Sequence, residues 1–313
     1  MSSSAHARYE LGEPKLVEVS ENIFAYLQPD GSWWINNAGF FVGSRGVTSI
    51  DGCSTAVRTR RYIDTIATVS SAPVRTLVNT HHHGDHTFGN YLFDSATILG
   101  HERTREDIFH YGLPFDAPIF EAVEWGPIEL APPSVTYESG VKLWVDDLAV
   151  EVSYVGQPAH TTNDSIIWVP ERGVLFVGDL LFNGGTPFLL MGSVTGAIEV
   201  LESVVKPIPA ATIVPGHGEV CGRELVDEVL DYLRFVMRVA EDGIRSGVSP
   251  LEAARQTDLG GFAGLLDSER IVGNLHRAYA ELNGAEPGAR IDTRAAFTDM
   301  VAYNGGKPLS CYA

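Results

Sequence analysis

The chain has 313 residues, of which 44% are hydrophobic, so it can bury a large core. Its net charge of −18 and the lack of a basic stripe argue against nucleic acid and anionic membranes as partners. A polar N-terminus, no membrane-length apolar run and three widely spaced cysteines lead us to expect a cytoplasmic protein with reduced thiols.

Apolar periodicity and turn residues predict mixed strands and helices in the first two thirds of the chain, after a loose lead-in at residues 1–14. We predict strands at residues 15–19, 22–27, 34–42, 46–51, 75–79, 97–100, 141–145, 148–155, 165–169, 174–177 and 211–214. We predict helices at residues 55–70, 88–93, 101–111, 196–205, 223–244, from 249 onward, 268–283 and 292–303. Residues 112–133 should be a long loop. This order favours an α+β layered core at residues 15–220 and a helical C-terminal extension at residues 221–313 packed on it.

A cluster of histidines follows the strand predicted at residues 75–79. The sequence from 80 to 87 is Thr-His-His-His-Gly-Asp-His-Thr, with far more titratable groups than a packing loop needs. Imidazoles and carboxylates are ligands of zinc. Alternate residues at a strand end point the same way, so His81 and His83 can converge on one ion. Asp85 and His86 follow a turn at Gly84 and can face a second ion. The alternative is a polar loop that binds metal adventitiously.

Three further strands each end in one candidate ligand: His160, Asp179 and His217. Taken alone, each is weak, because a single histidine is more often exposed or satisfied and Gly-Asp is a common turn. Together with the cluster they provide five histidines and two aspartates. That is enough for two ions with three or four protein ligands each.

The pattern His81-x-His83-x-Asp85-His86, followed by the three later ligands, resembles the signature of the metallo-β-lactamase fold. The resemblance implies an αββα sandwich with two zinc ions at one edge; iron or manganese would also tolerate these ligands. It assigns His81, His83 and His160 to one zinc, Asp85, His86 and His217 to the other, and Asp179 to both. It also places His82 away from the metals. Asp51 resembles a position that supports the ligands, and a plain turn aspartate is the alternative.

Two zinc ions would activate water near neutral pH and polarise a carbonyl. Asp85 is the predicted catalytic residue, which would orient that water and receive its proton. The expected reaction is hydrolysis of an ester, thioester, lactone or amide, and the same Lewis acid could support aldol-type ring closure. Candidate pocket residues are aromatic or apolar, although each could equally be a core residue. They are Trp33 and Trp34 on an early loop, Phe115 and Phe120 in the long loop, and Phe188, Leu189, Leu190 and Met191 after Asp179.

Over nearly its whole length the chain is similar to the metallo-β-lactamase-fold cyclase/thioesterases of bacterial aromatic polyketide pathways, of the actinorhodin type. The stretches that carry this similarity are 79–90, 186–188 (TPF), 192–193 (GS), 258–260 (DLG), 262–267 (FAGLLD), 274–278 (NLHRA) and 301–306 (VAYNGG). The similarity implies a thioesterase of antibiotic biosynthesis that releases a polyketide from its acyl carrier protein with closure of a ring.

Two other functions compete with this reading. One is a general metallo-hydrolase of a small-molecule lactone, amide (including β-lactam-like) or simple ester, which would turn over generic esters without ring closure. The other is a non-catalytic metal-binding protein, which the complete ligand set disfavours. The apolar C-terminal helices could also form the face of a homodimer.

Overall fold

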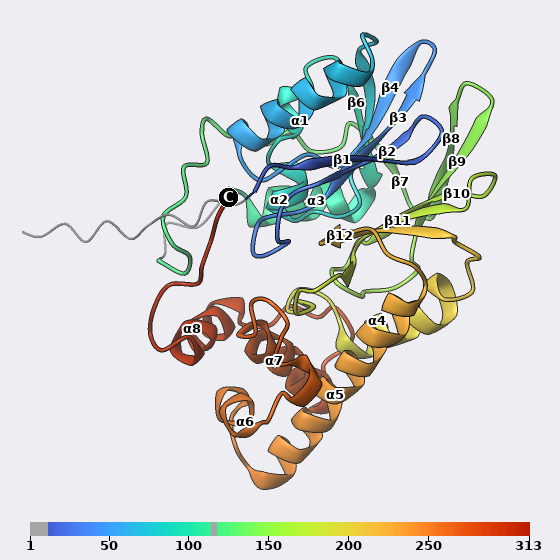
Figure 1. The fold of residues 1–313 in the computed structure, drawn as a ribbon. Coiled ribbons are helices and arrows are strands. Elements are labelled where there is room, and N and C mark those ends of the chain that lie inside the picture. Colours follow the sequence, from blue (N-terminus) through green and yellow to red (C-terminus); the bar gives the residue numbers. More distant parts are fainter. Residues whose placement is uncertain (1–11, 114–117) are drawn as a thin grey trace, which may run out of the picture.

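The computed structural model describes residues 12–113 and 118–313, and it forms two packed β-sheets with helices outside them (Figure 1). Most of the predicted lead-in and Phe115 lie outside the described residues. Within the described ranges, no helix combines the length and the apolar character needed to cross a bilayer.

The first sheet is built from the N-terminal part of the chain. In the described residues it has seven strands in the order β1-β2-β3-β4-β5-β6-β7, antiparallel up to β4 and parallel from there. They are β1 (Lys15–Ser20), β2 (Ile23–Leu27), β3 (Ala38–Gly43), β4 (Gly46–Ile50), β5 (Val74–Val78), β6 (Thr97–His101) and β7 (Val135–Tyr137).

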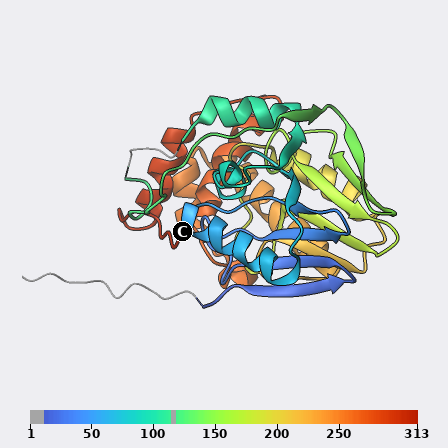
Figure 2. The same cartoon turned by 90° about the horizontal axis from the view of Figure 1, so that it is seen from above.

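The second sheet follows in the chain and, among the described residues, has five strands in the order β12-β11-β10-β9-β8. They are β8 (Gly140–Val145), β9 (Leu148–Tyr154), β10 (Ser165–Val169), β11 (Val174–Phe182) and β12 (Thr212–His217). Seen from above, the blue strands of the first sheet and the green strands of the second lie side by side (Figure 2).

Strand β2 shows how the layers are held together, because it is buried on both faces. Phe24 and Tyr26 pack outward in a cluster with Tyr62 of α1 (Ala56–Val69). Ile23 and Ala25 alternate with them and pack inward against the second sheet. The helix–sheet–sheet order follows from this alternation.

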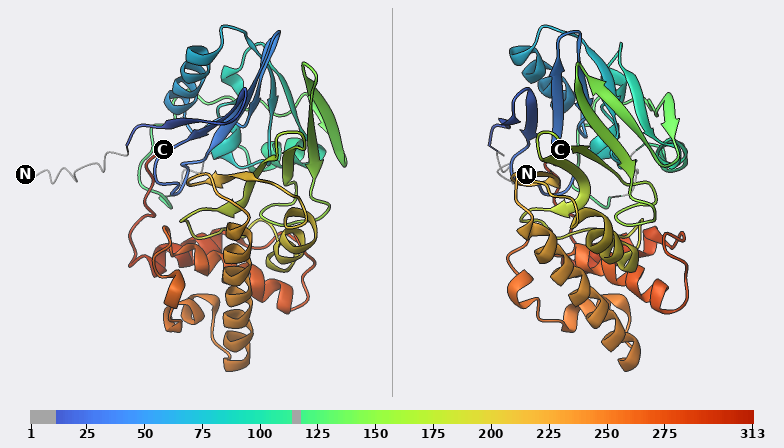
Figure 3. Two further views of the ribbon diagram at one scale, coloured as in Figure 1. Left: turned by 45° about the vertical axis from the view of Figure 1, so that its right-hand side comes forward. Right: turned by 90° about the vertical axis from the view of Figure 1, so that its right-hand side faces the viewer.

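The outer face of the second sheet is covered by the C-terminal helices, which lie below the sandwich (Figure 3). They are α4 (Val194–Val200), continued by a π-helical turn (Leu201–Val205), α5 (Glu224–Ser246), α6 (Pro250–Gln256), α7 (Arg270–Leu282) and α8 (Thr293–Tyr303). Leu175 and Val177 of β11 share one buried cluster with Val229 and Leu233 of α5 and Leu275 of α7. The predicted α+β sandwich with a helical extension is confirmed; the division at residue 220 stays a prediction.

Some element boundaries were predicted wrongly. Strand β3 begins at Ala38, not at residue 34, because Trp34 has a φ of 68°, which an extended strand excludes. Strand β11 continues to Phe182, past the expected turn at Gly178, because its parallel pairing with β12 extends to Phe182 opposite His217. The short strand β7 and the one-turn helix α2 (Gly84–Thr87) were missed.

The helix predicted at residues 88–93 is only a short 3-10 turn, Asn90–Leu92, and the remaining predicted elements agree closely with the structure. Helix α3 (Glu102–Tyr111) directly follows β6. Residues 118–133 contain no helix or strand beyond an isolated bridge between Phe120 and Leu309, as expected for the long loop.

Candidate metal centre

Seven side chains converge where strands of both sheets end. His81 and His83 follow β5, and His160 follows β9. The other four lie in α2 (Asp85, His86), within β11 (Asp179) and at the last residue of β12 (His217). These are the seven ligands that the sequence predicted, and the structure brings them together as two groups that share Asp179.

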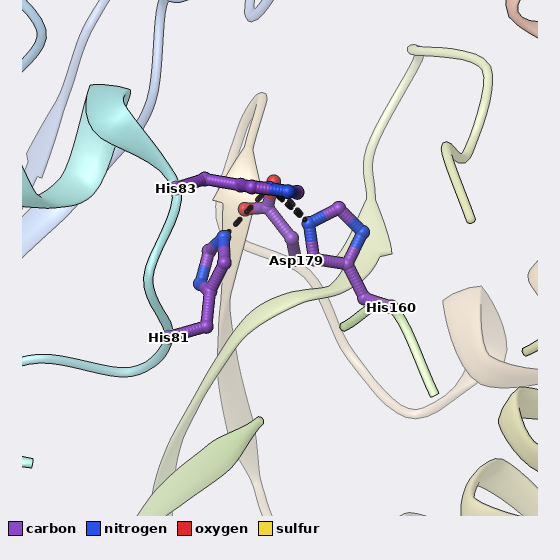
Figure 4. A group of neighbouring side chains, drawn as sticks. All are labelled: His81, His83, His160 and Asp179. Atoms are coloured by element: carbon purple, nitrogen blue, oxygen red, sulfur yellow. Dashed lines mark hydrogen bonds and ion pairs between the residues drawn. The ribbon is translucent and has the colours of Figure 1, made fainter. Parts of the chain in front are cut away.

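The first group consists of His81, His83, His160 and Asp179 (Figure 4), whose ligand atoms all lie within 4.8 Å of one another. His160 Nε2 is 2.8 Å from His83 Nδ1 and 3.3 Å from Asp179 Oδ2. His81 Nε2 is 3.9 Å from the same carboxylate oxygen. Three imidazoles and a carboxylate therefore face a single point.

The second group consists of Asp85, His86, Asp179 and His217, all of them buried. His217 Nε2 lies 3.2 Å from Asp179 Oδ2 and 3.4 Å from Asp85 Oδ2. His86 Nε2 lies 3.0 Å from Asp179 Oδ1. The carboxylate of Asp179 thus stands between the two groups and offers an oxygen to each.

Several of these atoms lack the partners that buried polar atoms normally have. Among the described residues, His81 Nε2 is buried without a hydrogen-bond partner. His86 Nε2 and Asp179 Oδ1 are close to each other, but neither makes a hydrogen bond to any residue that the structure describes. Such atoms are rare in folded proteins unless a water or an ion satisfies them. Nitrogen and carboxylate donors also match the preference of zinc. The donor set therefore fits two divalent cations.

Burial controls the protonation of the first group. It lowers the pKa of His81 and of His83 well below the usual range, and neighbouring imidazoles lower both further. Neutral imidazole is the form that binds a metal. Burial opposes ionisation of Asp179, but His217, His86 and His160 outweigh it and hold the pKa of that carboxyl well below its usual range.

A layer of hydrogen bonds orients the imidazoles. Asp51 Oδ2 accepts from His86 Nδ1 at 2.8 Å, and the same carboxylate accepts from the backbone N and the Oγ1 of Thr80 at 2.8 and 2.7 Å. His160 Nδ1 donates to the carbonyl of Phe188 at 2.5 Å, and His217 Nδ1 to that of Gly31 at 3.1 Å. Each bond fixes the proton on Nδ1 and turns Nε2 toward the site.

The structure favours the supporting role of Asp51, because its carboxylate accepts a hydrogen bond from His86. Its φ of 56° is left-handed, but no turn is formed at this position. His82 lies outside both groups. Its ring stacks on Tyr111, and its Nδ1 lies 3.0 Å from the amide nitrogen of Asn163.

A cavity with aromatic walls opens onto both groups. Five of the pocket residues predicted from the sequence line it: Trp33, Trp34, Phe120, Phe188 and Met191. Leu189 and Leu190 were predicted wrongly, because both are buried in the core cluster and do not line the cavity. Three further wall residues were missed: Phe182 from β11, Arg270 from α7 and Phe297 from α8. Their sequence positions look like ordinary core positions, and only the long-range packing brings them to the site.

Comparison with known proteins agrees with this geometry. The family model of the metallo-beta-lactamase superfamily matches residues 31–217. The chain belongs to the metallo-beta-lactamase superfamily. By family it is a metal-dependent hydrolase, as the ligand pattern predicted.

Two curated relatives illustrate the range of the superfamily. A hydroxyacylglutathione hydrolase of Synechococcus sp. is 28% identical over 208 residues, 63% of this chain and 68% of that protein. A metallo-beta-lactamase type 2 of Bacteroides fragilis is 23% identical over 220 residues, 68% of this chain and 82% of that protein.

Solved structures of the superfamily show the same fold. A metallo-beta-lactamase from Pontibacter korlensis aligns with a TM-score of 0.60 and 17% identity, over 71% of this chain and 99% of that one. The DIM-1 metallo-beta-lactamase aligns with a TM-score of 0.58 and 20% identity, over 72% of this chain and 99% of that one.

Proposed function

We propose that the chain is a two-zinc hydrolase of acyl thioesters with a largely apolar acyl group. One observation carries this proposal: two donor groups share Asp179 and lie against a cavity with aromatic walls. The thioester is supported by the Synechococcus relative, whose name describes hydrolysis of an acyl derivative of glutathione. The apolar acyl group is supported by the rings of Trp33, Phe120 and Phe188, which pack edge to face in the wall.

The seven donors would hold two zinc ions, which lower the pKa of water and polarise a carbonyl. Asp85 lines the cavity, and its side chain is 11% exposed against 4% for Asp179. It is therefore the carboxylate better placed to orient an attacking water and to hold its proton. Trp33 and Phe188 would exclude bulk water from the acyl chain, because their rings pack against each other at 4.8 Å.

Within this class we propose an aromatic polyketide thioester, free or bound to an acyl carrier protein, with ring closure accompanying its release. Support comes from one of the C-terminal stretches that resemble the polyketide cyclase/thioesterases, residues 274–278, because its Asn274 supports a segment of the cavity wall. Asn274 accepts a hydrogen bond from the backbone N of Leu189 at 2.8 Å and donates to the carbonyl of Pro187 at 2.7 Å. It thereby fastens the segment that carries Phe188.

The test is a hydrolysis panel with zinc-loaded protein. It contains aryl thioesters, oxoacyl thioesters, a lactone and a β-lactam, and zinc content is measured in each sample. We expect thioester hydrolysis, with kcat lowered about a hundredfold or more in Asp85→Asn. Asp94→Asn, which changes an exposed carboxylate in the same way, should behave as wild type.

Turnover of the β-lactam or lactone with inert thioesters would overturn the proposal in favour of a general metallo-hydrolase. If thioesters are hydrolysed, a synthetic poly-oxo thioester tests the finer claim. Aldol-type closure followed by dehydration gives a cyclic product lighter than the linear acid by one water, and closure without dehydration gives an isomer of that acid that chromatography separates. An acid of unchanged skeleton as the sole product would refute the cyclase.

A further inference from the structure

One arginine lies in the wall of the metal cavity. Among the described residues that line it, Arg270 is the only arginine or lysine, and its side chain is 1% exposed. Its guanidinium carbon lies 4.1 Å from the ring centre of Trp33 and 5.2 Å from that of Phe182. Phe182 in turn stacks on His217 at 4.8 Å. One phenyl ring therefore separates the guanidinium from the metal centre.

The charge of Arg270 is already matched within the protein. Its Nη2 lies 2.8 Å from Asp267 Oδ2, and its Nη1 donates to the carbonyl of Thr186 at 3.0 Å. A second carboxylate, Glu269, accepts a hydrogen bond from Trp33 Nε1 at 2.7 Å. One guanidinium therefore lines this end of the cavity, and two carboxylates lie directly against the residues that form it.

Arg270 also has a hydrogen-bond donor that lacks an acceptor in the part of the chain that the structure describes. A guanidinium has five N–H donors, and two of its nitrogens have protein partners here. Its Nε is buried and has no hydrogen-bond partner among the described residues. A buried donor of this kind is costly unless something accepts from it.

We propose that Arg270 is a specificity-determining residue that donates a hydrogen bond to a neutral carbonyl oxygen on the acyl chain of the substrate, while Asp267 and Glu269 exclude a carboxylate from the same position. The proposal rests on the thioester hydrolysis proposed above. The recognised oxygen belongs to the chain beyond the scissile carbonyl, because Phe182 separates Arg270 from His217.

The charges of Arg270, Asp267 and Glu269 favour a neutral oxygen on the substrate over an anionic one. A carboxylate would bring a third negative charge to a desolvated place with a single guanidinium, which is costly. A ketone oxygen accepts from the free N–H without adding charge. A substrate that lacks this oxygen leaves the donor unpaired, so we expect it to be disfavoured about 10- to 100-fold.

Binding tests the proposal without any need for turnover. Zinc-loaded protein is titrated in a calorimeter with thioether analogues of equal chain length. They carry a ketone at successive positions, a methylene at the same position, or a terminal carboxylate. Wild type should bind the best ketone about 10- to 100-fold more tightly than its methylene partner, and the carboxylate most weakly.

Three variants separate recognition from a purely structural role. Arg270→Lys should reduce the ketone preference to about threefold or less, with little change for the methylene analogue. Asp267→Asn should leave the preference for the ketone analogue unchanged. It should strengthen binding of the carboxylate analogue about tenfold or more, because Arg270 then lacks its carboxylate partner. Arg277→Lys removes another buried guanidinium of α7, one that does not line the cavity, and should leave the ratio unchanged.

No ketone preference in wild type, or an equal loss for all analogues in Arg270→Lys, would overturn the assignment. If Arg270→Lys does not fold, unchanged carboxylate binding in Asp267→Asn would overturn it as well. Hydrolysis of the matching thioesters is measured separately, so inert thioesters with intact ketone selectivity would refute the proposed function and not the role of Arg270.

Discussion

Asp51→Asn should disturb the candidate ligand His86, although Asp51 itself belongs to neither donor group. The carboxylate accepts three hydrogen bonds, two from Thr80 and one from His86 Nδ1. An amide has one oxygen and one NH2, so one donor must meet another donor. If the NH2 group faces His86, the imidazole moves its proton to Nε2, which is the atom that faces the site. We expect zinc affinity at the group of Asp85, His86 and His217 to fall about 10- to 100-fold, or about 1.4–2.7 kcal/mol.

A chelator competition with the metal-free protein measures this loss, and urea unfolding measures stability. Asp164→Asn is the matched control, because that buried carboxylate accepts from the backbone N and the Oγ1 of Thr161 at 2.8 and 2.7 Å and holds no imidazole. Both variants should lose about 1–3 kcal/mol of stability. Only Asp51→Asn should weaken one of the two zinc-binding steps. Equal affinities in the two variants would refute the reasoning.

Three further predictions concern the shared ligand, the cavity wall and the thiols. Asp179→Ala removes an oxygen from both groups, so bound zinc should fall from two to at most one per chain and hydrolysis should drop more than about a thousandfold; two retained zinc ions would contradict the shared role. Phe188→Ala should destabilise the fold by about 3 kcal/mol in urea and raise KM more than it lowers kcat; an unchanged KM would remove Phe188 from the binding wall. Burial raises the pKa of each cysteine thiol to about 12, so a thiol-reactive disulfide reagent should label the native protein far more slowly than the unfolded chain. Fast native labelling would contradict the burial of Cys53 and Cys311 and the partial burial of Cys221.

The ligands could be predicted from the sequence because the signal is local. His81 and His83 lie in the loop after β5, His160 lies in the loop after β9, and His217 is the last residue of β12. A strand end fixes where such a side chain can point before anything is known of its partners. Individual strands were predictable for the same reason, since the alternating exposure along a strand such as β8 depends only on neighbouring residues.

The features that were missed depend on contacts between distant parts of the chain. Gly178 and Asp179 read as a turn, yet pairing with β12 keeps them in a strand. Arg270 sits at the start of an amphipathic helix and reaches the cavity only because Trp33 packs over its guanidinium. No local pattern contains that contact, so sequence periodicity alone could not place Arg270 in the site.

The bonds of Asn274 have a consequence for how this enzyme can diversify. The carbonyl of Phe188 orients His160 while its ring forms the cavity wall, and Asn274 in the C-terminal extension fastens both neighbours of Phe188. A chain cut after His217 would keep all seven ligands and still lose the anchor of one of them. The C-terminal extension therefore cannot be exchanged independently of the metal site. Replacing it to change substrate specificity would also change the affinity for metal.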